Sequence, residues 1–165
     1  GAEALAEVLP FPNKVAVIYM TGAQLLETLE AASQGLPYTA ETADACASLM
    51  QVSGLTYTVD TTKAYDALEA YGDHWFTAGS VSRVRIDDVN GQPFDAEATY
   101  AVVTSNANFN GMDSSYVLKA AAEANEQSAV TTAVVRDVVF RFIAAELNHQ
   151  VGEAYAAPQG RLTIL

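Results

Sequence analysis

A strand, a polar loop and a helix follow one another between residues 99 and 123, and this stretch constrains the fold more than any other. Residues 99–103 read Thr-Tyr-Ala-Val-Val, a β-branched and aromatic run that predicts a strand. Residues 116–123 predict a helix, with Ser114 or Ser115 available as its N-cap. Ligands often bind where a strand ends and a helix begins, although an ordinary capped turn gives the same pattern.

The length and composition predict one soluble globular domain. The chain has 165 residues, half of them apolar, and no apolar run approaches the length that crosses a bilayer, so no membrane insertion is expected. The formal charge is −12, from 20 acidic residues against 8 Lys and Arg. A nucleic acid would be repelled by such a surface, whereas a small nucleotide remains compatible because a few well-placed donors outweigh the average field. Cys46 is single, which excludes an intramolecular disulfide.

The pattern of periodicities and breakers predicts an α+β fold with a mixed sheet, covered by helices, rather than a doubly wound parallel sheet. Thr21 and Gln24 are spaced as a capping box at the start of one helix, and Asn90-Gly91 is a hairpin signal. The predicted helices cover residues 2–9, 22–32, 116–123 and 134–147, the last being the longest. The predicted strands cover residues 14–20, 50–60 with an interruption at Ser53-Gly54, 82–89, 99–103 and 161–165. Residues 37–48 are expected to form a loop that can include a helical turn, and residues 61–80 a long excursion.

No pattern in the sequence predicts a catalytic or metal centre. The two histidines, His74 and His149, are far apart, and Asp73-His74 lacks the clustered ligands of a two-metal site. Neither a G-x-S-x-G elbow nor a P-loop is present. Arg83 and Arg85 share one face of a predicted strand and could meet a phosphate, but a solvated face is the favoured interpretation.

Several short motifs, in a fixed order, resemble the C-terminal domain of the 5′-nucleotidase family. They span nearly the whole chain from Leu9 onwards. The matching pieces are Leu9-Pro10-Phe11-Pro12-Asn13, Thr21-Gly22 with Leu25, Gln51-Val52-Ser53-Gly54, Gly91-Gln92-Pro93-Phe94-Asp95 with Thr99-Tyr100, Asn106 through Gly111 with Asp113, and Gly160-Arg161-Leu162.

The resemblance implies a division of labour between two domains. Family members pair an N-terminal metallophosphoesterase domain, which holds two divalent metals and hydrolyses the phosphate ester, with a C-terminal domain that binds the nucleoside. The resemblance therefore implies that residues 1–165 form one substrate-binding domain that holds no cofactor and is inactive by itself. Its partners would be a nucleoside or nucleotide and the metal-binding domain, and its location would be outside the cytoplasm, secreted, periplasmic or on the cell surface.

The resemblance also implies candidate substrate-binding residues: Asn106, Phe109, Gly111, Asp113, Ser53 and Gly54. Asp113 stands where the family's aspartate accepts hydrogen bonds from ribose, although Asx side chains also cap turns. Phe109 or the pair Trp75-Phe76 would serve as a substitute stacking ring, against the more common role of such residues as core.

Three residues depart from the family's pattern. Leu49 and Ala107 stand where family members carry the two aromatic rings that grip the base, and Met112 replaces a glycine. The family's G-G-x-x-R strand would precede Ala2, so the resemblance implies that the domain lacks its first segment. These departures support the alternative, a non-catalytic surface or interaction module that retains the fold with a degenerate pocket.

Overall fold

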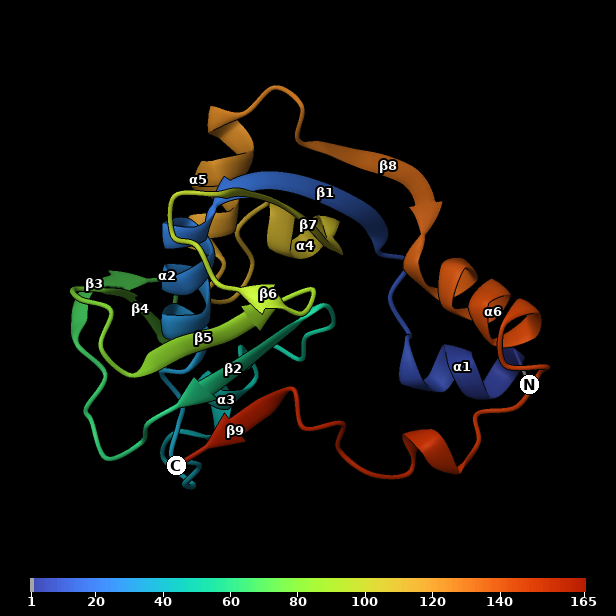
Figure 1. The fold of residues 1–165 in the computed structure, drawn as a ribbon, viewed down its shortest axis with the longest axis horizontal. Helices are drawn as coiled ribbons and strands as arrows, with labels where there is room; N and C mark the ends of the chain where they lie inside the picture. Colours follow the sequence, from blue (N-terminus) through green and yellow to red (C-terminus); the bar gives the residue numbers. More distant parts are fainter. Residues whose placement is uncertain (1) are drawn as a thin grey trace.

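The computed structural model describes residues 2–165, in which helices and strands alternate irregularly (Figure 1). The helices are α1 (Ala2–Val8), α2 (Gly22–Ala32), α3 (Ala43–Cys46), α4 (Asn106–Phe109), α5 (Tyr116–Ala124), α6 (Val135–Ala145) and the 3-10 turn η1 (Glu153–Tyr155). The strands are β1 (Lys14–Thr21), β2 (Leu55–Val59), β3 (Ala67–Tyr71), β4 (Trp75–Ala78), β5 (Val84–Val89), β6 (Gln92–Pro93), β7 (Thr99–Ser105), β8 (Ala129–Val134) and β9 (Leu162–Ile164).

The strands of residues 2–165 form three sheets. One sheet has the order β7-β1-β8, with both neighbours antiparallel to β1, and a second has the order β6-β5-β2-β9. Its last pair, β2 and β9, is parallel, so this sheet is mixed as the sequence predicts. The third sheet is the hairpin β3-β4, which lies within the excursion of residues 61–80.

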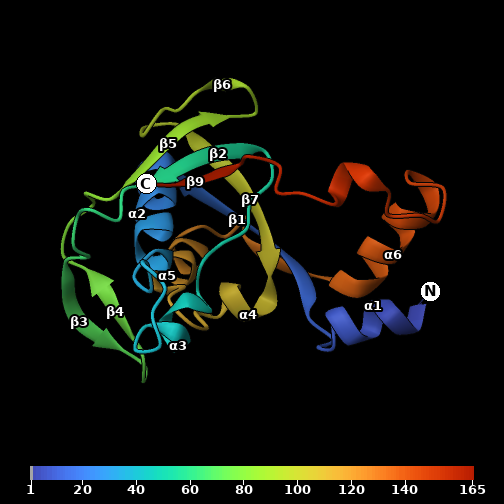
Figure 2. The same ribbon diagram turned by 90° about the horizontal axis from the view of Figure 1, so that it is seen from below.

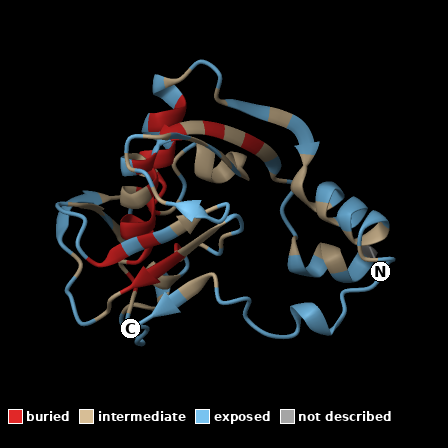
Figure 3. Ribbon diagram, in the orientation of Figure 1, coloured by how far each residue is buried: buried red, intermediate tan, exposed pale blue. Residues whose placement is uncertain are grey.

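The core lies between the first two sheets and the helices α2 and α5. Strand β1 buries Ala16, Ile18 and Met20 at every second position, as a strand with one face on the core must. Helix α2 buries Leu25 and Leu29 on the same stripe, and Tyr57 adds the largest fully buried side chain. The buried residues are shown in red in Figure 3 and are confined to this part of the molecule.

Helix α2 begins as its sequence directs. The Thr21 hydroxyl accepts a hydrogen bond from the Gln24 amide at 3.2 Å, and the Gln24 side chain accepts one from the Thr21 amide at 2.9 Å. Both halves of the predicted capping box are therefore present. The first residue of the helix, Gly22, lies against the turn at residues 95–96. A Cβ on Gly22 would clash with the Asp95 carbonyl oxygen, so this close approach requires glycine.

Helices α1 and α6 lie against each other at one side of the molecule, away from the core (Figures 1 and 2). None of the residues of α6 is buried, and Val138, Phe140 and Phe142 are about half exposed. An apolar hollow of about 550 Å³ lies between the two helices and is bordered by Leu5, Val8 and Ile143, among others.

Several predicted elements differ from the structure. Strand β8 is absent from the predictions, which leave residues 129–133 unassigned because they carry little apolar alternation. In the structure this strand pairs with β1. The helix predicted over residues 134–147 ends at Ala145 and, with 11 residues, equals α2 rather than exceeding it. The strand predicted from Met50 starts at Leu55, because Gly54 turns the chain with a φ of 81°.

Candidate functional site

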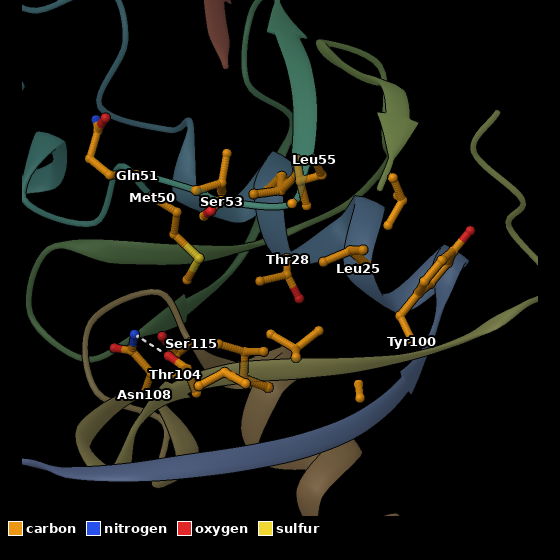
Figure 4. Close-up of a pocket in the computed structure, with 18 of the residues that line it drawn as sticks. Leu25, Thr28, Met50, Gln51, Ser53, Leu55, Tyr100, Thr104, Asn108 and Ser115 are labelled. Atoms are coloured by element: carbon orange, nitrogen blue, oxygen red, sulfur yellow. Dashed lines mark hydrogen bonds between the residues drawn. The ribbon is translucent and has the colours of Figure 1, made fainter. Parts of the chain in front are cut away.

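A pocket of about 1000 Å³ opens between α2, the loop that precedes β2, and β7 (Figure 4). Leu25 and Thr28 face it from α2, and Ser53 and Leu55 face it from the loop and from the start of β2. The remaining wall comes from β7 and from the polar loop that follows it. Segments far apart in the sequence therefore meet at one cavity.

Strand β7 borders the pocket along residues 99–104. The reason is its position: β7 is the edge strand of its sheet, and within residues 2–165 it pairs with β1 alone. An edge strand presents backbone N–H and C=O groups along its free side. The pocket wall therefore offers main-chain donors and acceptors in addition to side chains.

The polar loop after β7 folds into a short helix before the chain turns into α5. Ser105 caps α4, its hydroxyl accepting a hydrogen bond from the Asn108 amide at 3.3 Å. The Asn108 side chain donates to the Thr104 hydroxyl at 3.0 Å, a bond that lies at the pocket in Figure 4. Helix α5 starts after Ser115, so the predicted position of the N-cap is correct. The Ser115 side chain makes no capping hydrogen bond, so that part of the prediction is wrong.

Asp113 stands at the turn between α4 and α5. Its φ of 56° places it in the left-handed region, which Asp tolerates better than most residues. Asp113 borders the pocket, and within residues 2–165 its carboxylate accepts no hydrogen bond. The carboxylate is therefore available to a ligand.

The structure brings three of the six predicted binding residues to the pocket and leaves three outside it. Ser53, Gly54 and Asp113 border the cavity. The Asn106 amide oxygen instead accepts a hydrogen bond from the Lys14 amide at 2.7 Å, and Phe109 packs against the core. The ligand-binding role of each of these residues stays a prediction.

Gly111, the sixth predicted residue, lies outside the pocket lining and is held by the β3-β4 hairpin. The Tyr71 hydroxyl donates to the Gly111 carbonyl at 2.6 Å. Gly111 has a φ of 85°, and a Cβ there would clash with the Tyr71 hydroxyl. The Tyr71 ring also packs against Tyr116, with centroids 5.6 Å apart. The hairpin thus fixes the turn that carries Asp113, two residues further on.

The three positions that depart from the family's pattern lie in different places. Leu49 borders the pocket. Ala107 lies in α4, where its carbonyl accepts a hydrogen bond from the Met112 amide at 3.0 Å. Met112 is 58% exposed and lies outside the core.

Several pocket residues could not be found from the sequence. Thr28 fits the sequence pattern of a helix, and Tyr100 fits that of a strand. No further feature of the sequence indicates that either residue borders a pocket. Asn108 lies inside the polar loop, and its proximity to Asn106 and Asp113 was the available signal.

Arg83 is buried and does not face a phosphate site, so the interpretation of a solvated strand face is wrong for it. It is 3% exposed, and its guanidinium donates to the carbonyls of Ser33 at 3.2 Å and Leu36 at 2.7 Å. Burial lowers the pKa of Arg83, while the Glu30 carboxylate opposes that shift. Arg85 is exposed and pairs with Asp87 at 2.7 Å.

No group of three or more potential metal ligands occurs among the described residues. His74 lies in the turn between β3 and β4, edge-on to Trp75, and His149 follows α6. The two histidines thus lie in separate regions.

Comparison with known protein families and structures gives one consistent result. The sequence model of the family "5′-nucleotidase, C-terminal domain" matches residues 2–120. Comparison with curated proteins gives no match.

The 5′-nucleotidase precursor from Thermus thermophilus has a similar structure, with a TM-score of 0.72 and 28% sequence identity over 99% of this chain. The NAD nucleotidase of Haemophilus influenzae, at 17% identity over 99% of the chain and a TM-score of 0.67, shares the fold. A putative 5′-nucleotidase from Staphylococcus aureus, at 16% identity over 97% of the chain and a TM-score of 0.61, shares it as well. The chain spans 27%, 26% and 29% of the length of these proteins. The predicted fold class, α+β with helix-covered mixed sheets, is confirmed.

Proposed function

This chain belongs to the 5′-nucleotidase family, as a C-terminal domain, and we propose that it binds the nucleoside part of a nucleotide for a phosphohydrolase that acts in nucleotide catabolism. One observation carries the proposal: Ser53 and Gly54 of the Q-V-S-G motif and Asp113 of the polar loop, 59 residues apart from Gly54 to Asp113, border the same pocket. Their convergence is what a shared ligand requires.

The pocket suits a nucleoside in size and in chemistry. Ligand pockets in proteins commonly occupy about 300–1,000 Å³ and combine apolar walls with a few polar groups. Leu25 and Leu55 supply apolar wall here, and Asp113 with Asn108 supplies polar groups. A carboxylate that accepts hydrogen bonds from two sugar hydroxyls makes strong, charge-assisted contacts.

Catalysis belongs, in this proposal, to an N-terminal metallophosphoesterase domain with divalent metals outside residues 1–165. The binding domain alone would then release no phosphate from nucleotides when Mn²⁺ or Mg²⁺ is added. We also propose a location outside the cytoplasm, supported by the description of the Thermus thermophilus protein as a precursor. Among the described residues, no helix is both long and apolar enough to cross a membrane.

Calorimetric titration with adenosine, inosine and uridine tests the binding proposal. We expect millimolar to high-micromolar affinity for at least one nucleoside. The variant Asp113→Ala should weaken it about tenfold or more, since a hydrogen bond to a charged group contributes about 1.5–3 kcal/mol. The control Asp137→Ala removes an exposed carboxylate from α6 and should bind as the parent chain does. No heat with any nucleoside at millimolar concentration would refute the proposal.

A second candidate function, a non-catalytic interaction module, is favoured by the exposed apolar side chains of α6. Val138, Phe140 and Phe142 are each 45–47% exposed on one helix. Exposed apolar patches commonly mark interaction surfaces. Absence of nucleoside binding, together with binding of a protein that the variant Phe140→Ser weakens, would favour this function over the first.

A further inference from the structure

We infer that the chain carries a site of spontaneous covalent modification, the deamidation of Asn90 in the turn between β5 and β6, and that the fold protects a second Asn-Gly dipeptide from the same reaction. The sequence contains two such dipeptides, Asn90-Gly91 and Asn110-Gly111. Both asparagines are exposed, so exposure does not distinguish them. The difference lies in the surroundings of the two glycines. The inference goes beyond the proposed function and does not depend on nucleoside binding.

The reaction needs only the asparagine, the glycine that follows it and water. The backbone nitrogen of the glycine attacks the side-chain carbonyl carbon of the asparagine, and the new C–N bond closes a five-membered succinimide ring. The bond from that carbon to the side-chain nitrogen breaks, and this nitrogen leaves as ammonia with the proton of the glycine amide. Water then opens the ring at one of its two carbonyls and gives aspartate or isoaspartate. Asparagine is for this reason among the thermolabile residues of proteins.

The peptide unit between the asparagine and the glycine must rotate before the nitrogen can reach the side-chain carbon. Glycine permits this approach best, because it has no Cβ to obstruct it. The rotation also breaks the hydrogen bonds and packing contacts of that peptide unit, so it occurs through a local opening of the structure. The rate at each dipeptide therefore depends on how firmly its glycine is held.

Gly91 is held loosely. Asn90 and Gly91, with φ of 52° and 73°, form the two-residue turn of the β5-β6 hairpin, which protrudes at the top of the molecule in Figure 2. Within residues 2–165 the Gly91 amide has one acceptor, the side-chain carboxylate of Asp88 at 3.2 Å. A Cβ on Gly91 would meet no atom of the described residues within 4 Å. The peptide unit can therefore rotate once a single side chain turns away.

Gly111 is held by the main chain and by two side chains. Its amide donates to the Asn108 carbonyl at 3.0 Å, and its carbonyl accepts a hydrogen bond from the Tyr71 hydroxyl at 2.6 Å. A Cβ on Gly111 would lie 2.9 Å from the Cδ atom of Lys119 and closer still to the Tyr71 hydroxyl. Rotation of the Asn110-Gly111 peptide unit would break the first bond and displace the second. The same dipeptide is thus much harder to open here than in the hairpin.

Deamidation of Asn90 would change both the charge and the main chain beside the pocket. Asn90 borders the pocket, and its amide donates to the Gly54 carbonyl at 2.7 Å. The product adds a carboxylate to a segment that already contains Asp87 and Asp88, and like charges repel. Isoaspartate also lengthens the main chain by one methylene, so a two-residue turn no longer closes the hairpin in the same register. The modification would thus loosen the contact between this turn and Gly54.

Incubation of the folded chain in mildly alkaline buffer, followed by peptide mass spectrometry over time, tests the inference. The peptide mass reveals the exchange of an amide for a carboxylate, and fragmentation of the peptide separates aspartate from isoaspartate. We expect the peptide with Asn90 to deamidate at least about tenfold faster than the peptide with Asn110, and to contain isoaspartate. Equal rates, a faster reaction at Asn110 or an unreacted Asn90 would overturn the inference.

The same measurement in concentrated urea separates the effect of the fold from that of the sequence. In the unfolded chain the two rates should come within about threefold of each other, because both dipeptides are Asn-Gly and the contacts that hold Gly111 are lost. This control needs no variant, so it does not depend on the folding of one. A tenfold ratio that persists in urea would overturn the inference, since the fold would then not be the cause of the protection.

A variant of Tyr71 tests the cause of the protection directly. Tyr71→Phe removes the hydroxyl that holds the Gly111 carbonyl, and it should accelerate deamidation at Asn110 about fivefold, the equivalent of one neutral hydrogen bond. The rate at Asn90 should not change. The control Tyr65→Phe removes a hydroxyl that donates to the Phe76 carbonyl, and it should alter neither rate. An unchanged rate at Asn110 in Tyr71→Phe would overturn the assigned cause. None of these measurements uses a nucleoside, so their outcome is separate from that of the proposed function.

Discussion

Helices α2 and α6 have the same length of 11 residues and similar amphipathic sequences, yet they differ completely in burial. Helix α2 has seven buried residues, among them Leu29 at 1% exposure, and lies beside β1, β5 and α5. Helix α6 has none, and it lies beside α1 and β8 at the edge of the molecule (Figure 3). A helical pattern therefore specifies an apolar face but not the surface that covers it.

The largest expected difference between the two helices is in their tolerance of truncated side chains. Leu29→Ala should lower the free energy of unfolding by about 2–5 kcal/mol, because it leaves a cavity in a packed core. Val138→Ala on α6, at a 45% exposed residue, should change it by about 0.5 kcal/mol or less. Urea denaturation followed by circular dichroism measures both. A loss at Val138 as large as that at Leu29 would mean that the α6 face is covered in solution.

Each of the two helices carries a carboxylate, and the cost of replacing it by the corresponding amide should differ between the two helices. Glu30 of α2 is fully buried, and its carboxylate accepts hydrogen bonds from the amides of Arg83 at 3.0 Å and Val84 at 2.9 Å. Glu30→Gln replaces the charged acceptor of those amides with a neutral amide oxygen and should cost about 1–3 kcal/mol, because a hydrogen bond to a charged group is the stronger one. Asp137→Asn on α6 alters an exposed side chain and should cost nearly nothing. Equal effects in urea denaturation would contradict the assignment of Glu30 as the acceptor that anchors β5.

Alkaline pH should destabilise the fold through two tyrosines of the core, Tyr57 of β2 and Tyr116 of α5, which have no counterpart in α6. Burial raises the pKa of Tyr57 and of Tyr116 to about 12, whereas both phenols titrate near 10 in the unfolded chain. The folded state keeps these protons after the unfolded state has lost them, so stability is complete below about pH 10 and falls as pH rises toward 12. The slope should be up to about 1.4 kcal/mol per pH unit for each tyrosine. Melting temperatures at pH 9, 10 and 11 measure it, and Tyr57→Phe should make the decline shallower. A flat profile above pH 10 would show that the phenols are not shielded.

The smallest expected effect is on nucleoside affinity, and it concerns a chain of contacts that runs from α2 to the pocket. Glu27 of α2 accepts a hydrogen bond from the Tyr116 hydroxyl at 2.9 Å, and the Tyr116 ring packs on Tyr71, which holds Gly111. Tyr71→Phe should weaken adenosine binding about threefold, the equivalent of one neutral hydrogen bond. In the Asp113→Ala background it should add nothing, because Tyr71 acts through the turn that carries Asp113.

A matched control for Tyr71 lies next to the same hairpin. The Tyr65 hydroxyl donates to the Phe76 carbonyl at 2.8 Å and makes no hydrogen bond to the turn before α5. Tyr65→Phe should therefore leave nucleoside affinity unchanged in the same calorimetric titration. Additive effects of Tyr71→Phe and Asp113→Ala would exclude a positioning role for Tyr71.

Local signals in the sequence predicted the elements well where one residue type determines a backbone geometry. Thr21 and Gln24 form the predicted capping box, and Asn90-Gly91 forms the predicted turn, both residues having positive φ. β8 was missed because its pairing with β1 joins residues more than a hundred positions apart, and no local pattern encodes such a contact. The burial of Arg83 was missed for the same reason, since its partners Ser33 and Leu36 belong to the segment after α2.

The candidate pocket was predictable in part. The motif resemblance pointed to Ser53, Gly54 and Asp113, which do border one cavity. Tyr100 and Thr28 were not predictable as pocket residues, because a strand and a helix account for them without a ligand. Asn106 shows the opposite case: a polar residue in a promising loop whose side chain accepts a backbone hydrogen bond from Lys14.

The parallel pairing of β2 with β9 determines when the pocket can form while the chain is being synthesised. The Tyr57 amide donates to the Arg161 carbonyl at 2.9 Å, and the Leu165 amide donates to the Val59 carbonyl at 2.9 Å. Thr61 and Leu165, which also bond, are 104 residues apart. On a ribosome that makes the chain from its amino end, α2 and β1 can meet early, whereas β2 lacks its parallel neighbour until residues 162–164 of β9 emerge. The wall formed by the Gln51–Leu55 segment is therefore completed only after β9 has been made, and a nascent chain stalled before Leu162 would carry the residues of the pocket without its finished shape.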